Sequence, residues 1–287
     1  MGPFVAVANA LTVSFSDVFI KKLKGEDTFF LIWLRLASAL PILALAVTIF
    51  SEWHVPELSF WLIIAVINTP LEIFQFYVGY HAIQRSPLSL MAPLHASTSI
   101  FLIPVGYVIL GEQPTMIGLV GIFTIVAGAF VLGWRIGQTH SLSQSIANVF
   151  AEPGTVLILT GSFLVSISIV TTRYVVTNLA SPFLTAFYLT AAIALALTPI
   201  AFRRGTGVSI AGHGGMLGGL SILSGFSFGL HYFGLSLMPA AYFISIKRVS
   251  MLFNVIGGRV FFHEDHIRER FAGALLMIAG VMLIALG

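Results

Sequence analysis

Ten long apolar runs follow one another along the chain, and they constrain its fold more than any other feature. A helix needs roughly 20 residues to cross the hydrocarbon core of a bilayer. Only 9% of the 287 residues are charged, whereas a soluble domain carries about 25%. We therefore expect an all-α integral membrane protein with ten transmembrane helices, at about 3–20, 28–50, 58–83, 88–110, 115–134, 155–175, 182–202, 215–236, 240–262 and 267–286.

One connection is much longer than the others and separates five runs from five. It covers residues 136–153, and four apolar residues within it fall on one helical face, as expected for a short helix in the membrane interface. An ordinary linker is the alternative. The expected organisation is a first five-helix repeat at 1–135, an interfacial linker at 136–153 and a second five-helix repeat at 154–287.

The two halves resemble each other when residue n is placed beside residue n+152. The ungapped matches include Tyr80 with Tyr232, Pro87 with Pro239, Glu112 with Glu264, Gly121 with Gly273 and Gly128 with Gly280. Because each half has an odd number of spans, the second half must enter the membrane from the opposite side. We therefore expect two inverted five-helix repeats, a construction common in secondary transporters.

Four stretches carry a resemblance to a known family. They are LGEQPTMIGLVGIFTIVAGAFVLG at 110–133, FHEDHIRERFAGALLMIAGVMLIALG at 262–287, YHAIQRSP at 80–87 and YFGLSLMP at 232–239. In their order and spacing they resemble the ends of the two repeats of the drug/metabolite transporter superfamily, EamA-like branch. The resemblance covers all ten spans and implies a ten-helix carrier with a central cavity and alternating access. It implies no single substrate, because the superfamily moves amino acids, sugars, nucleotide sugars and drugs.

Two adjacent cations, Lys247 and Arg248, lie inside the ninth run, where a charge is costly. Lys247 starts a polar stripe with Ser250 and Asn254 at i, i+3 and i+7. Its repeat partner is His95, which inverted symmetry would place near the same cavity. We expect Lys247 to bind a substrate carboxylate or phosphate. Snorkelling of the ammonium group to the lipid headgroups is the alternative.

Further polar residues inside the spans extend this candidate site. Glu72 lies near the middle of the third run, and a lone buried carboxylate costs on the order of several kcal/mol unless it is paired or protonated. It therefore either pairs with a cation or exchanges a proton during transport. The substrate-binding candidates are Lys247, His95, Tyr80, Tyr232, Asn254, His231 and Arg35, and the candidate for proton coupling is Glu72.

Two other sets of polar or small residues fit the scaffold better than the transport site. Glu112 and Glu264 each lie between one run and the next, where a carboxylate can cap a helix N-terminus. The paired glycines of the fifth and tenth runs suit close approach of two helices. We expect both sets to hold helices together.

Enzyme patterns fail on spacing. HEDH at 263–266 places its two histidines at i and i+3, whereas the zinc protease pattern needs i and i+4. The chain has no Cys, which excludes disulfides and thiolate metal sites. We expect no enzyme activity, no cofactor and no metal. The net charge of +3 comes mostly from short loops, so we expect no nucleic-acid partner.

The distribution of loop charges leaves the orientation of the chain open. Most Lys and Arg residues lie in loops on the side opposite the termini. The positive-inside rule therefore places both termini outside the cytoplasm, whereas the family resemblance places them inside.

The candidate cations outnumber the candidate carboxylates, which favours an anionic or zwitterionic substrate such as an amino acid or a related organic acid. We expect a secondary transporter of such a small polar metabolite in the bacterial inner (cell) membrane, as a monomer or weak dimer. Its partners are the substrate, the lipid bilayer and, as a candidate coupling ion, the proton. The alternatives are a proton-coupled antiporter of cationic drugs or amines that uses Glu72, and a channel-like or non-transporting membrane protein.

Overall fold

The computed structural model describes residues 1–22, 27–85, 88–133, 153–203, 214–253 and 271–287, which are helical with short turns and contain no β-strand. This confirms the expected all-α class. The helices are α1 (Gly2–Lys22), α2 (Thr28–Phe50), α3 (Leu58–Leu62), the π-helical turn η1 (Ile63–Asn68), α4 (Thr69–Arg85), α5 (Leu88–Leu110), α6 (Met116–Gly133), α8 (Pro153–Asn178), α9 (Pro182–Arg203), α10 (Gly214–Leu237), α11 (Ala240–Lys247) and α13 (Phe271–Leu286).

Most of the expected spans have a matching apolar helix among the described residues. Five helices are long and apolar enough to cross a membrane, at Phe29–Phe50, Leu58–Val78, Leu159–Asn178, Pro182–Arg203 and Leu217–Leu237. Shorter apolar helices lie at Gly2–Ser16, Ser97–Leu110, Met116–Ala129 and Ala272–Leu286. The expected span 240–262 begins with α11, and its residues after Phe253 lie outside the described part of the chain. Residues 136–152 of the expected interfacial linker also lie outside it.

Helix ends follow local rules of capping. Asp27 precedes α2, and its Oδ1 accepts hydrogen bonds from the N–H groups of Phe29 and Phe30, at 2.9 and 3.3 Å. Gly111 follows α5 with φ of +68°, and its N–H donates to the carbonyl of Tyr107 at 3.0 Å. This is the left-handed helix ending that glycine adopts without a Cβ penalty.

The chain divides into two compact units that do not coincide with the halves of the sequence. Unit 1 contains Met1–Ile73 and Thr171–Met238, and unit 2 contains Phe74–Val170 and Pro239–Gly287. Each unit therefore combines segments from before and after the long connection. Two boundaries between the units fall within α4 and α8, and the third falls between α10 and α11.

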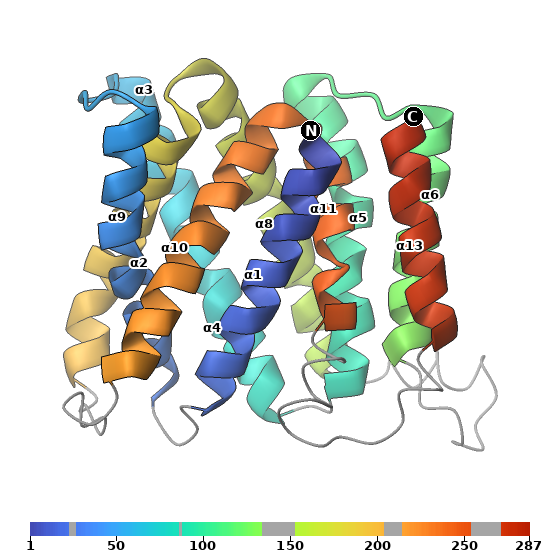
Figure 1. The fold of residues 1–287 in the computed structure, drawn as a ribbon, viewed down its shortest axis with the longest axis horizontal. Helices are drawn as coiled ribbons and strands as arrows, with labels where there is room; N and C mark the ends of the chain where they lie inside the picture. Colours follow the sequence, from blue (N-terminus) through green and yellow to red (C-terminus); the bar gives the residue numbers. More distant parts are fainter. Residues whose placement is uncertain (23–26, 86–87, 134–152, 204–213, 254–270) are drawn as a thin grey trace. The chain divides into compact units, whose positions relative to one another are not determined.

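In unit 1, α10 lies beside α1 and α2, and α2 lies beside α9 (Figure 1). A Cβ added to Gly225 would lie 2.4 Å from the Cβ of Ile42, so α2 and α10 approach too closely for any larger residue there. The Ser221 hydroxyl donates to the Ser38 carbonyl one turn earlier on both helices, so these helices run in the same direction. The contacts of α10 with α1 and α2 fix which face of α10 is turned toward these two helices.

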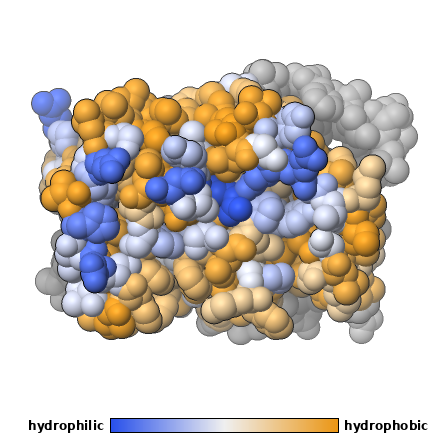
Figure 2. All heavy atoms as spheres, turned by 90° about the horizontal axis from the view of Figure 1, so that it is seen from above, coloured by the Kyte–Doolittle hydropathy of each residue, from blue (hydrophilic) through white to orange (hydrophobic). Residues whose placement is uncertain are grey.

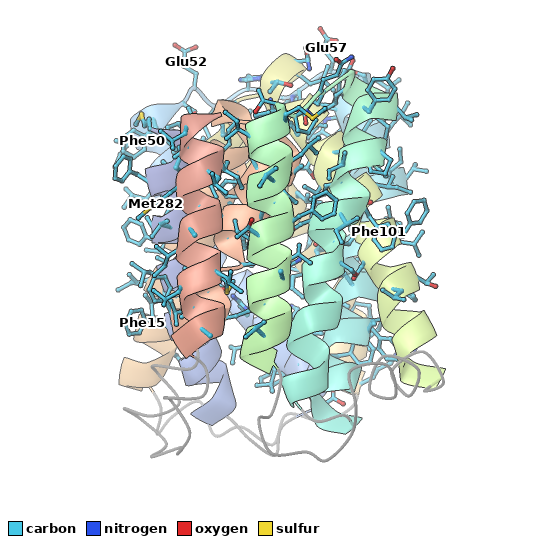
Figure 3. The ribbon with its side chains drawn as sticks, turned by 90° about the vertical axis from the view of Figure 1, so that its right-hand side faces the viewer. Phe15, Phe50, Glu52, Glu57, Phe101 and Met282 are labelled. Atoms are coloured by element: carbon cyan, nitrogen blue, oxygen red, sulfur yellow. The ribbon has the colours of Figure 1, made fainter. Side chains whose placement is uncertain are left out.

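In unit 2, α6 and α13 pack closely and antiparallel through paired glycines (Figure 3). A Cβ on Gly121 would lie 2.9 Å from the Gly280 carbonyl oxygen, and one on Gly128 would lie 2.8 Å from that of Gly273. The expectation that these glycines permit close helix approach is confirmed. Contact between main chains leaves Gly121, Gly128 and Gly280 no room for a side chain.

A second contact in unit 2 links the α5–α6 connection to α11. Oε2 of Glu112 accepts a hydrogen bond from the N–H of Ala240, the first residue of α11, at 3.2 Å. In return, the Tyr242 hydroxyl of α11 accepts from the N–H of Thr115, just before α6, at 2.7 Å. The expected capping role of Glu112 is confirmed, although it caps α11 and not the helix that follows it in sequence. Glu264 lies outside the described residues.

Large apolar side chains cover the outside of the helices, as lipid contact requires. Phe4, Phe226 and Met282 are 83%, 55% and 61% exposed. Figure 3 shows Phe15, Phe50 and Met282 turned away from the helices, and hydrophobic residues form much of the surface in Figure 2. Polar side chains, in contrast, include many that are buried.

Candidate functional site

The inner face of α10 carries a polar stripe within unit 1. Ile222 and Phe226, both about half exposed, mark the outer face of this helix. Each is two residues from Ser224, a rotation of about 200°, so Ser224 lies on the opposite side, where it is fully buried. Ser227 and His231 follow Ser224 at i+3 and i+7 on the same face.

Two groups of opposite charge reach this inner face from other helices. The Arg35 guanidinium of α2 lies over the Phe228 ring, with Cζ 5.8 Å from the ring centroid. Glu72, in the first turn of α4, interacts electrostatically with Tyr232. Because Phe228 and Tyr232 are four residues apart, the two side chains with which the cation and the carboxylate interact lie on adjacent turns of α10.

Aromatic rings lie among these charges. Tyr232 is buried, and its ring meets the His231 ring edge to face at a centroid distance of 5.4 Å. Both side chains can donate and accept hydrogen bonds. Arg35, Glu72, His231 and Tyr232, each predicted from the sequence, are therefore gathered around two turns of one helix, and we call them the unit 1 cluster.

The π-helical turn η1 positions the helix that carries Glu72. The N–H of Thr69 bonds to the carbonyl of Ile64, five residues back, and Pro70 follows without an N–H of its own. Asn68, at the end of this turn, donates from Nδ2 to Thr172 Oγ1 at 2.5 Å and accepts from Thr171 Oγ1 at 3.3 Å. The amide thus ties the start of α4 to α8, one turn from Glu72.

Asn9 of α1 did not stand out in the sequence, yet it contacts the same stripe. Its side chain is fully buried, and Nδ2 donates to the Ser227 carbonyl at 2.6 Å. Its Oδ1 has no hydrogen-bond partner among the described residues. The available signal was the spacing of Asn9, Thr12 and Ser16 at i, i+3 and i+7 in an otherwise apolar run.

The remaining predicted residues are not placed with the unit 1 cluster. Lys247 is half-buried at the end of α11, in unit 2. Tyr80 and His95 belong to α4 and α5, but their side chains lie outside the described part of the structure, and so does Asn254. The expected meeting of Lys247 and His95 therefore stays a prediction.

Helical geometry changes at the pair of cations, where an uninterrupted helix was expected. The N–H of Arg248 is shared between the carbonyls of Ile244 and Ser245, and that of Val249 bonds to Ile246, three residues back. Such bonds tighten the chain to about three residues per turn. Lys247 and Ser250 therefore remain on one face, and the positive charges lie at a helix C-terminus, where the helix dipole favours them.

Helices with apolar outer faces, buried polar side chains and part-buried charged groups are typical of an integral membrane protein with a polar interior, as transporters have. The chain matches the EamA-like transporter family over residues 1–134 and 152–286, and it belongs to that family. It is thus a membrane transporter of the drug/metabolite type.

The fold has a counterpart among solved structures. One chain described as "Crystal structure of protein" superposes with a TM-score of 0.74, covering 99% of this chain and 95% of that chain at 13% identity. At this identity the similarity shows the fold alone. No curated protein matches the chain.

Proposed function

We propose that this transporter is a secondary carrier that moves a small anionic or zwitterionic metabolite, such as an amino acid or a related organic acid, across the bacterial inner membrane by alternating access. The observation that carries the proposal is the unit 1 cluster, where Arg35 lies over Phe228 and Glu72 interacts electrostatically with Tyr232, one turn further along α10. A cation and a carboxylate that act on the same stretch of one helix match the two charges of a zwitterion or the charge and coupling proton of an acid.

Each residue of the cluster has a chemical role in this proposal. The planar guanidinium of Arg35 binds a substrate carboxylate through two parallel hydrogen bonds. His231 and Tyr232 donate further hydrogen bonds and supply an apolar wall. Glu72 takes up and releases the coupling proton, a role that carboxyl groups inside membrane spans commonly have.

The α6–α13 pair supports the inverted repeats that alternating access uses. Gly121 contacts Gly280, and Gly128 contacts Gly273, while n+152 relates Gly121 to Gly273 and Gly128 to Gly280. If each glycine is replaced by its counterpart in the other repeat, the Gly121–Gly280 contact becomes the Gly273–Gly128 contact. A two-fold axis can therefore relate the two helices. Because the helices are antiparallel, this axis is perpendicular to them and lies in the membrane plane, which is the symmetry of inverted repeats.

Binding and transport measurements test the proposal. Purified protein is screened by thermal unfolding against amino acids and organic acids, since a ligand of the native state raises the melting temperature. The ligands found are then followed by counterflow in proteoliposomes. Arg35→Gln should abolish counterflow, whereas Arg203→Gln, which removes an exposed cation at the end of α9, should not. Binding of amines alone, or transport by Arg35→Gln at the wild-type rate, would contradict the proposal.

An antiporter of cationic drugs or amines is the second candidate function. Glu72 interacts electrostatically with Tyr232, and a carboxylate together with an aromatic ring offers an organic cation a negative charge and a ring face. In this case Glu72→Gln should abolish binding of the cation itself, and Arg35→Gln should leave that binding in place.

A further inference from the structure

We propose that Asn9 and Ser224 form a subsite that accepts N–H donors of the substrate, above all its ammonium group. The inference rests on the proposed carrier function and adds a determinant of specificity to it. It would make the transporter selective for amino acids over the corresponding acids without an amine.

The first step is the orientation of the Asn9 amide. A main-chain carbonyl can only accept, so the 2.6 Å contact with the Ser227 oxygen must be made by the NH₂ group of Asn9. The amide oxygen then has to point elsewhere. It has no partner among the described residues although the side chain is fully buried. A buried acceptor of this kind is available to a donor that arrives with a ligand.

The second step is the hydroxyl of Ser224. This side chain is fully buried on the inner face of α10, three residues before Ser227, and its Oγ also has no partner among the described residues. It lies within about one helical turn, 5.4 Å of rise, of the residue that Asn9 contacts. An amide oxygen and a hydroxyl oxygen together suit an ammonium group, which donates up to three hydrogen bonds and accepts none.

The third step is the position relative to Arg35. On α10, Ser227 contacts Asn9 of α1, and the next residue, Phe228, lies beneath the guanidinium of α2. Viewed down the helix, Ser224 falls between these two directions, about 60° from Ser227 and 40° from Phe228. The subsite for the amine and the cation for the carboxylate therefore flank the same stretch of α10, as the two charged groups of an amino acid require.

Matched ligand pairs test the subsite. The probes are aspartate and succinate, glutamate and glutarate, leucine and 4-methylpentanoate, and phenylalanine and 3-phenylpropanoate, whose members differ only in the ammonium group. Affinities are measured on the purified full chain by thermal shift and by competition in counterflow. Wild type should prefer the amine-bearing member, and Ser224→Ala should lower that preference on the order of tenfold.

Variants separate recognition from structure. Asn9→Leu removes both the acceptor and the tether to Ser227, so it should abolish the preference and lower the melting temperature. Ser224→Ala leaves the tether intact and should change the preference with little change in melting temperature. Ser236→Ala, on the same helix, removes a hydroxyl that donates to the Phe233 carbonyl and should leave the preference unchanged.

The two proposals fail in distinguishable ways. If wild type binds members of the panel but shows no preference for the amine, or keeps its preference in both Ser224→Ala and Asn9→Leu, the subsite is wrong and the carrier proposal stands. In that case Asn9 only joins α1 to α10. If wild type binds and moves no member of the panel, the carrier proposal fails and the subsite falls with it.

Discussion

Glu112 and Tyr242 show how single polar groups satisfy helix ends inside a membrane. The first N–H groups of any helix have no partner within it, and lipid offers none. Here the connection before α6 supplies Glu112 to the start of α11, and α11 supplies Tyr242 to the start of α6. Both side chains therefore have a structural role.

Removing the Tyr242 hydroxyl should therefore destabilise the protein. Tyr242→Phe leaves the part-buried Thr115 N–H without its protein acceptor, and the loss of such a hydrogen bond costs about 0.5–1.5 kcal/mol. Thermal unfolding in detergent measures the effect. The control is Tyr174→Phe, an exposed tyrosine on α8. Equal melting temperatures for both variants would show that the hydrogen bond contributes little.

Replacing Glu72 tests proton coupling at a single carboxyl group. Glu72→Gln keeps the size and hydrogen-bonding ability of the side chain but cannot release a proton. We expect substrate binding and counterflow to continue while accumulation driven by a pH gradient is lost. Glu57→Gln is a matched control, because Glu57 is exposed and makes no capping hydrogen bond to α3. Accumulation that persists in Glu72→Gln would leave Glu72 as a structural partner.

At the scale of residues, charges inside apolar runs were the features that the sequence alone could single out as site candidates. Arg35, Glu72 and His231 could be named because such groups are rare inside a membrane. Asn9 and Thr172 could not, because uncharged polar residues are common in these runs and their role depends on which helix lies opposite. Only the contacts of Asn9 with Ser227 and of Asn68 with Thr172 reveal it.

At the scale of elements, the pattern of apolar residues predicted where the helices lie, but it did not predict the irregular turns within them. Asp27 and Gly111 mark helix ends by their own chemistry, so those boundaries were readable. The π-helical turn at Ile63–Asn68 and the tightened turn after Lys247 change which main-chain groups pair, and hydrophobicity carries no signal for that. The grouping of α1 with α10 likewise depends on packing between distant segments.

The contact between α6 and α13 can be tested with a pair of matched glycine substitutions. Gly128→Ala places a Cβ 2.8 Å from the Gly273 carbonyl oxygen, and forcing the main chains apart should cost about 1–3 kcal/mol. Gly218→Ala on α10 meets nothing within 4 Å and gains up to about 1 kcal/mol of helix propensity. The melting temperature should therefore fall in Gly128→Ala and rise in Gly218→Ala. A stable Gly128→Ala protein would mean that the helices separate without cost.

Arg173 stabilises the contact between two helices of unit 1, α8 and α10. Its guanidinium donates to the carbonyls of Leu235 and Met238 and so satisfies the end of α10. A cation at that position also favours the negative end of the helix dipole. Arg173→Gln should lower the melting temperature but preserve substrate selectivity, whereas Ser224→Ala should do the reverse. Loss of selectivity in a well-folded Arg173→Gln protein would place this residue in the binding site instead.

For the whole molecule, alternating access predicts that polar inner faces reach water and outer faces do not. The chain has no native Cys, so single cysteines can be introduced without background. Ser224→Cys, on the inner face of α10, should react with a small hydrophilic thiol reagent, and substrate should protect it. Ile222→Cys, two residues away on the outer face, should react slowly and without protection, because a lipid-facing thiol rarely ionises.

Lys247→Cys and His95→Cys should behave like Ser224→Cys if both belong to the transport pathway. Because each carrier state opens to one side only, reagent added from one side should label these positions in proportion to the state that is populated. Reaction at Ile222→Cys with none at Ser224→Cys would place the pathway along other helices, and equal labelling from both sides at once would indicate a channel.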